Sequence, residues 1–190
     1  MLLLLAILAA DFSGTWVGTV NGGPMCLALS QNTADLTGHL AYENDRKYAE
    51  LSSGKVNGEQ LDFEVADTDH GTIRFRFHAE GEKLIGDDGA VLTKWVPRRN
   101  RQFDAGKPVP PSIIRSVSPN TNSKETGTVK LSILILTNGD VDPRSIKVGS
   151  SAGKALDEAA IQAVVQWKLT PPREDCNFYE KRVPVEFNFR

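Results

Sequence analysis

Histidines and acidic clusters are the residues of this sequence that could bind a metal ion. The three histidines are His39, His70 and His78, and only His70 has close acidic neighbours, in Asp67-Thr-Asp-His70. A metal site needs three or four converging ligands, whereas an acidic stretch between two strands is typical of a solvated turn. We therefore expect no metal site in this protein.

Patterns for nucleophilic or nucleotide chemistry are missing from the sequence. It contains no Gly-x-Ser-x-Gly, no phosphate-binding loop and no dinucleotide fingerprint. The carboxylate pair Asp87-Asp88 precedes Gly89, which is the composition of a turn. Because no group of residues forms a catalytic constellation, we predict that the protein is not an enzyme and uses no cofactor.

Two cysteines, Cys26 and Cys176, lie in opposite halves of the chain. Two thiols alone are a poor zinc shell. In an oxidising compartment they are a candidate disulfide, provided that their Cα atoms come within about 7 Å. The alternative is that they are two independent thiols that pack as small hydrophobic side chains.

Composition and charge describe an ordinary globular protein. Of 190 residues, 40% are hydrophobic and 24% are charged, and the formal net charge is −2. Binding to nucleic acid or directly to an anionic membrane needs concentrated positive charge, and the basic cluster at residues 98–101 is local. We therefore expect neither partner, and a membrane association that is indirect at most.

The first ten residues, Met1 to Ala10, are wholly apolar and end in small side chains. A helix of that length spans about 15 Å, half of a bilayer core. The segment has the features of the core and cleavage region of a secretory signal, so we expect export and processing near Ala10. The alternative is a buried N-terminal strand.

A change of composition near residue 97 divides the chain. The stretch Pro97–Pro111 is rich in proline and charge, as linkers are. We predict a signal segment at residues 1–10, a small all-β domain at 11–97, a linker at 98–107 and a second domain at 108–190.

Short alternating runs fill the first domain. Leu61, Phe63 and Val65 alternate with polar residues, as do the apolar residues of 73–77. This period of two, repeated every 8–12 residues, predicts an antiparallel barrel or sandwich. Strands are expected at residues 15–20, 25–31, 35–41, 47–51, 60–65, 72–79, 83–85 and 91–96.

The tripeptide Gly14-Thr-Trp16 opens the first strand. It resembles the Gly-x-Trp motif of lipocalin-type barrels, and also the small Gly-Thr-Trp β-domains of exported bacterial proteins. We expect Trp16 to belong to the core of a filled barrel or sandwich, since about 85 residues enclose little space beyond their own side chains. An exported small-ligand carrier remains the alternative function.

The second domain has mixed secondary structure. The run 128–137 predicts a central strand, and Asn138-Gly139-Asp140 a hairpin turn into a strand at 141–148. Apolar residues three and four apart predict a helix over 154–167, with Ser151 as its N-cap and Pro171 after its end. The run Val183–Phe189 alternates and predicts the last strand. The fold class is α+β, one helix on a three-stranded antiparallel sheet.

These elements carry a motif pattern in the right order. It comprises Gly127-Thr-Val129, Gly139-Asp-Val141, Ser150-Ser151, the helix residues Leu156-Asp157, Ala159-Ala160, Ala163-Val164 and Trp167, then Pro171 and Val183–Phe187. From about residue 108 to residue 190 the chain resembles the C-terminal domain of TonB-type energy transducers.

The resemblance implies a periplasmic protein-binding module of a Gram-negative envelope, linked to transport through outer-membrane receptors. In that family an extended segment of the receptor adds beside the final strand. The residues implied in partner binding are Val183, Val185, Glu186, Phe187, Asn188 and Phe189. The same exposed edge could pair with a second copy of the chain to form a homodimer.

Overall fold

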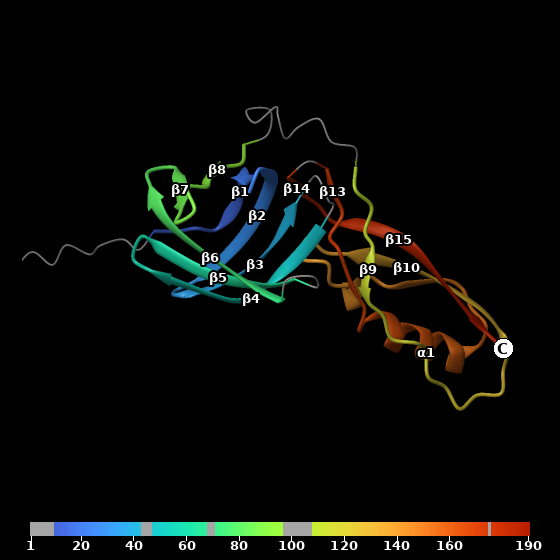
Figure 1. Ribbon diagram of the computed structural model, residues 1–190. Coiled ribbons are helices and arrows are strands. Elements are labelled where there is room, and N and C mark those ends of the chain that lie inside the picture. Colours follow the sequence, from blue (N-terminus) through green and yellow to red (C-terminus); the bar gives the residue numbers. More distant parts are fainter. Residues whose placement is uncertain (1–9, 43–46, 68–70, 97–107, 175) are drawn as a thin grey trace, which may run out of the picture. The chain divides into compact units, whose positions relative to one another are not determined.

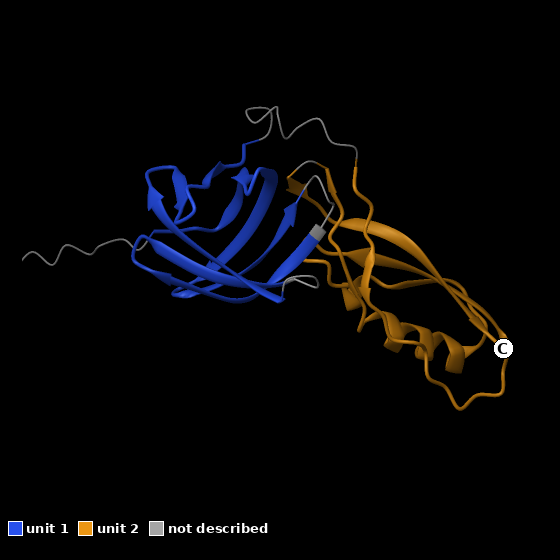
Figure 2. Cartoon of the chain, in the orientation of Figure 1, with its two compact units in different colours: residues 1–105 blue, residues 106–190 orange. Residues whose placement is uncertain are grey.

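A computed structural model describes residues 10–42, 47–67, 71–96, 108–174 and 176–190. The chain divides into two compact units, residues 1–105 and residues 106–190 (Figure 2). We call them the barrel unit and the C-terminal unit. Most of the predicted signal segment and all of the predicted linker, 98–107, lie outside the described residues.

The barrel unit is a closed meander of eight antiparallel strands (Figure 1). All eight strands predicted from the alternating runs are present, which confirms the all-β fold and decides for a barrel over a sandwich. The strands are β1 (Gly14–Val20), β2 (Gly23–Asn32), β3 (Asp35–Tyr42), β4 (Lys47–Asn57), β5 (Gln60–Asp67), β6 (Gly71–Glu80), β7 (Lys83–Gly86) and β8 (Val91–Lys94).

Apolar side chains fill the inside of the barrel. Every second residue of each strand points inward, so Leu61, Phe63 and Val65 are at most 2% exposed. The rings of Phe63, Phe75 and Phe77 stack, with the centroid of Phe63 lying 5.1 Å and 6.0 Å from the other two. This packed interior offers the small-ligand carrier hypothesis no support in the part of the barrel that is described.

Strand β1 closes the barrel by pairing with β8, from Trp16 opposite Lys94 to Thr19 opposite Val91. Trp16 is 5% exposed, and its Nε1–H donates to the carbonyl of Phe12 at 2.8 Å. Its role as a core residue is therefore confirmed. A Cβ on Gly18 would lie 2.1 Å from the carbonyl oxygen of Val91, so only glycine allows the two strands to approach this closely.

The C-terminal unit is one helix against a three-stranded sheet (Figure 1), as predicted. The sheet order is β11 (Lys147–Ser150), β10 (Gly127–Ile135), β15 (Lys181–Phe189), and the helix is α1 (Lys154–Val164). One face of β10 and one face of α1 form a single core. Its buried residues are Val129, Leu131, Ile133, Ile135, Val141, Leu156, Ala160, Val164 and Leu169.

Two details of this unit differ from prediction. The strand expected at 141–148 is interrupted by a 3-10 helix, Pro143–Ser145. The ring of Pro143 fixes its φ at a value that suits the first residue of a helical turn. The helix N-cap is Gly153, not Ser151. The Ser151 hydroxyl instead donates to the Asp157 carboxylate at 2.6 Å, and its oxygen accepts from the Gly153 amide at 3.2 Å.

Short strands that the sequence did not predict complete the C-terminal unit. Strand β9 (Ile113–Arg115) pairs with β12 (Lys168–Leu169), and β13 (Arg173–Glu174) pairs with β14 (Asn177–Phe178). The segment after β9 is held to the end of α1 by the indole of Trp167, whose Nε1–H donates to the Val117 carbonyl at 2.9 Å. These runs are too short to show a period in the sequence.

Candidate functional site

Strand β15 lies at the edge of the sheet in the C-terminal unit. It pairs with β10 in an unbroken antiparallel register from Gly127 opposite Phe189 to Ile135 opposite Lys181. No strand among the described residues pairs with its other side. All six residues that the resemblance implies in partner binding lie on this strand, so the geometry that strand addition requires is present.

Hydrogen bonds on the far side of β10 fix which backbone groups of β15 point outward. The Leu136 amide donates to Asp140, and the Asp142 amide donates to Leu134, at 2.8 and 3.0 Å. The even-numbered residues of β10 therefore bond away from β15. In an antiparallel pair, successive residues direct their backbone groups to alternate sides of the strand. The odd-numbered residues of β10 therefore bond to β15, and their partners include Val183 and Val185.

The even-numbered residues of β15 consequently present their backbone to the free edge. They are Arg182, Pro184, Glu186 and Asn188. Pro184 has no N–H, and its outward position means that it removes no bond from the ladder with β10. Of the six predicted residues, only Glu186 and Asn188 direct their backbone groups toward the free edge. Arg182, which was not among the six, has the same outward phase, and the position of Pro184 two residues away is the sequence signal that indicates it.

The odd-numbered side chains of β15 serve the core instead. Val183, Val185, Phe187 and Phe189 are half-buried against the cluster beneath α1. The ring of Phe187 meets Trp167 edge to face, with centroids 5.5 Å apart. These side chains therefore hold the strand against the core of the C-terminal unit.

Polar contacts order the outward side chains on the uncovered face of the sheet. The Lys130 ammonium lies 3.2 Å from the Glu186 carboxylate, and the Thr128 hydroxyl donates to Asn188 Oδ1 at 2.7 Å. Both pairs join β15 to β10 across the register. An exposed ion pair adds at most about 1 kcal/mol, so these contacts orient the edge more than they stabilise the unit.

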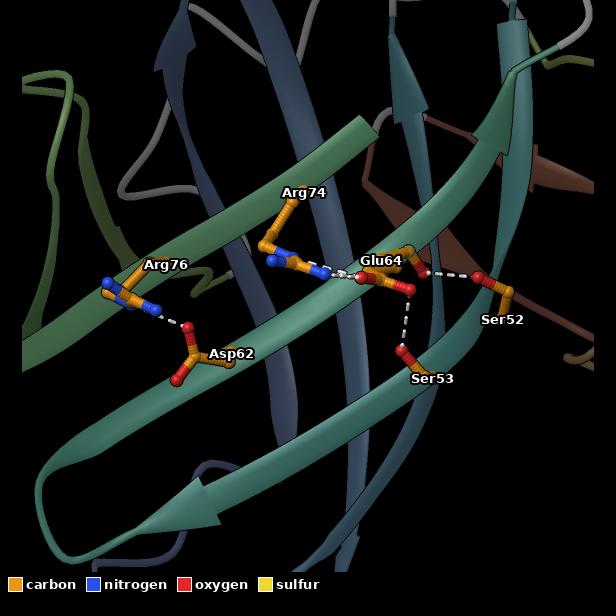
Figure 3. A network of polar contacts seen from close by, with 6 residues as sticks. All are labelled: Ser52, Ser53, Asp62, Glu64, Arg74 and Arg76. Atoms are coloured by element: carbon orange, nitrogen blue, oxygen red, sulfur yellow. Dashed lines mark hydrogen bonds and ion pairs between the residues drawn. The ribbon is translucent and has the colours of Figure 1, made fainter. Parts of the chain in front are cut away.

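The outer wall of the barrel unit carries a second polar array, along β5 and β6 (Figure 3). Arg74 donates from two guanidinium nitrogens to the Glu64 carboxylate, and Arg76 Nε donates to Asp62 at 2.6 Å. The hydrogen bond from Arg74 lowers the pKa of Glu64, and the bond to Asp62 raises the pKa of Arg76. Both shifts favour the charged forms of Glu64 and Arg76.

The residues considered for metal or acid–base chemistry are dispersed in the structure. His39 is buried beside the ring of Tyr48, with centroids 5.3 Å apart, and His78 lies 3.1 Å from the Glu80 carboxylate. Asp88 accepts a bond from the Ala90 amide at 3.0 Å, as in an ordinary turn. His70 lies outside the described residues, and those that are described contain no group of three metal-binding side chains.

Both cysteine side chains are fully buried, Cys26 on β2 of the barrel unit and Cys176 between β13 and β14 of the C-terminal unit. Their pairing remains a prediction. Within the described residues, none of the helical segments has the length and apolar character needed to span a bilayer.

Comparison with known proteins agrees with the geometry of the C-terminal unit. Residues 121–190 match the family described as Gram-negative bacterial TonB protein C-terminal. This match confirms the resemblance inferred from the motifs and covers β10, β11, α1 and β15. The family is an envelope domain that interacts with other proteins. No curated protein and no solved structure shows significant similarity to the chain.

Proposed function

We propose that the protein binds an extended segment of a protein partner, which adds as a strand beside β15. The observation that carries the proposal is the free edge of β15 within the segment that matches the family. The resemblance points to a segment of an outer-membrane receptor as the partner, and thus to a role in transport across the outer membrane.

The chemistry of this edge favours backbone recognition over side-chain recognition. Three outward amides, those of Arg182, Glu186 and Asn188, are donors, and the same residues and Pro184 offer carbonyl acceptors. Each backbone bond contributes on the order of 1 kcal/mol net. Binding through a few such bonds is moderate in affinity, which suits a contact that forms and breaks repeatedly.

Proline substitutions at outward positions test the mechanism. Pro184 already occupies one such position, so Glu186→Pro and Asn188→Pro each leave the ladder with β10 intact. Each removes one donor and places a ring at the edge, and we expect partner affinity to fall about tenfold. Glu186→Thr and Asn188→Thr are the matched controls, because they change the side chain and keep the amide.

The measurement is capture from an outer-envelope extract with the full chain as bait, followed by titration of the captured protein. A partner that the threonine variants retain and the proline variants lose supports strand addition. Equal capture by all four variants, with circular dichroism unchanged, would refute it.

A homodimer formed through the same edge is the competing use of β15. Sedimentation of the unmodified chain over a concentration series measures it directly. If self-association is present and Glu186→Pro abolishes it, the edge pairs with a second copy, and a partner would have to displace that copy.

We further propose that the protein is exported to the periplasm and processed near Ala10, on the evidence of the apolar run at residues 1–10. Intact-mass measurement of protein from its native host should give a chain that begins near Asp11. Recovery of the unprocessed chain from the cytosol would contradict this proposal.

A further inference from the structure

Strand β6 is only half covered in the wall of the barrel. It pairs with β5 from Gly71 to His78, but with β7 only from Phe77 to Glu80. No described strand lies beside its first half on the β7 side. We call this interruption of the wall the β6 notch.

Hydrogen bonds at either side show which backbone groups point into the notch. The Ala79 amide donates to the Glu59 carbonyl beside β5, whereas the Asp87 amide donates to the Arg76 carbonyl from the other side. Odd-numbered residues of β6 therefore bond to β5, and even-numbered residues direct their backbone groups to the β7 side, where the notch lies. Thr72 and Arg74 consequently direct an amide and a carbonyl each into it.

The notch has a hollow of about 390 Å³. Its base is apolar, formed by Phe75 and Phe77, which are 7% and 1% exposed. Its rim is polar and comes from two turns as well as from β6, with Asn21 between β1 and β2, and Asp87 and Asp88 between β7 and β8. This volume is at the low end of ligand pockets, roughly 300–1,000 Å³, and suits one or two side chains.

The charge around the notch is negative. Two guanidiniums, of Arg74 and Arg76, border the hollow together with the carboxylates of Asp87 and Asp88. Both guanidiniums are already engaged by carboxylates on β5, as Figure 3 shows. Since each guanidinium is paired with its carboxylate on β5, the negative charge that the rim offers to a ligand comes from Asp87 and Asp88, and Asp87 is only loosely paired, 3.9 Å from Arg76.

We infer that the β6 notch binds an extended peptide in which an apolar side chain is flanked by lysine or arginine. The free backbone groups of Thr72 and Arg74 form hydrogen bonds with its main chain. Its apolar side chain enters the hollow above Phe75 and Phe77, and its basic residues face Asp87 and Asp88. This inference concerns the barrel unit and does not rest on the function proposed for β15.

Three synthetic peptides provide the probes: acetyl-Lys-Val-Phe-Val-Lys-amide, its counterpart with glutamate in place of both lysines, and the lysine peptide with N-methylated central amides. The protein is the full chain carrying Glu186→Pro, so that the edge of β15 is obstructed. Amide shifts in ¹⁵N-labelled protein, followed during titration at low salt, report the binding position and the affinity.

We expect the lysine peptide to shift the amides of Asn21, Thr72 and Arg74, and to bind at least about fivefold more tightly than the glutamate peptide. Asp87→Asn combined with Asp88→Asn should bring the two affinities within about twofold, since asparagine keeps the turn and loses the charge. Thr72→Pro should weaken binding about tenfold by removing one outward donor. Thr72→Val, which keeps the amide, should bind as the unmodified protein does.

Two results would overturn the inference. One is the absence of shifts at these three amides at millimolar peptide. The other is equal binding of the N-methylated peptide, which would show that the backbone of β6 takes no part.

Discussion

Strand β1 is paired on both sides in the barrel unit, by β2 and β8, whereas β15 in the C-terminal unit is paired on one side only among the strands that the structure describes. Closure of the barrel at β1 and β8 requires a glycine where these two strands meet. The open sheet keeps one long edge, and its free backbone groups are a template for another strand. The two strands show that antiparallel pairing satisfies both sides of a strand where the sheet closes, and leaves one side unpaired where the sheet stays open.

The difference also appears in how each unit holds its strands. The barrel buries aromatic side chains from neighbouring strands against one another, as in the stack around Phe63. The C-terminal sheet has one helix to cover one face, and the side chains of β15 that pack there are only half-buried. Local opening should therefore be easier at β15 than within the barrel.

The largest effect should come from removing the centre of the aromatic stack. Phe63→Ala deletes a side chain that is 1% exposed and should destabilise the barrel unit by about 3–5 kcal/mol. Hydrogen exchange resolved by mass spectrometry should show loss of protection in β4, β5 and β6 with β10 and α1 unchanged. Loss of protection in both units together would mean that they do not fold separately.

A smaller effect is expected at the turn between β10 and Val141. Gly139 has φ of +88°, and a Cβ there would lie 1.9 Å from the carbonyl oxygen of Leu169. Gly139→Ala should cost the C-terminal unit about 2–3 kcal/mol. The control is Gly149→Ala, where the nearest atom would lie at 3.6 Å. Thermal denaturation of both variants checks the difference, and equal melting temperatures would contradict it.

The division into two domains, and the cross-link between them, can be tested together. Trypsin should cut at the arginines and lysine of residues 98–107 and leave two resistant fragments. If Cys26 and Cys176 form a disulfide, the fragments stay joined until a reductant is added. Separation without reductant would exclude the disulfide, and uniform degradation would exclude the linker.

The smallest effect concerns how the free energy of unfolding of the barrel unit depends on pH in the acid range. The hydrogen bond from Arg74 lowers the pKa of Glu64 below its ordinary value of 4.5, so the folded state binds this proton less readily than the unfolded state does. The resulting stabilisation is complete above that ordinary value and is lost as the pH falls through the lowered pKa. Arg74→Gln should therefore lower stability slightly at neutral pH, leave it unchanged at low pH, and so flatten the loss of stability below about pH 4.5, as measured by urea denaturation over a pH series.

Alternation and turn residues were enough to predict the barrel strands, because each strand buries one face and period two follows directly. The motif order likewise identified β10, α1 and β15. Prediction failed where two local conformations or two hydrogen-bond partners compete for the same residue. Pro143 turned a predicted strand into a 3-10 helix, and Ser151 bonded to Asp157 instead of capping the helix.

The sequence by itself determined the eight barrel strands, the strands β10 and β15, the helix α1 and the apolar side chains that form each core, because these follow from the spacing of apolar residues. It also determined the family of residues 121–190. Only the tertiary structure decided that β1 and β8 close the barrel, that β15 is an edge, and that Glu186 and Asn188 face outward. The order of the strands, and the side to which each backbone group points, depend on which segments pair across long distances in the chain. The alternation within a single strand carries no information about its neighbours.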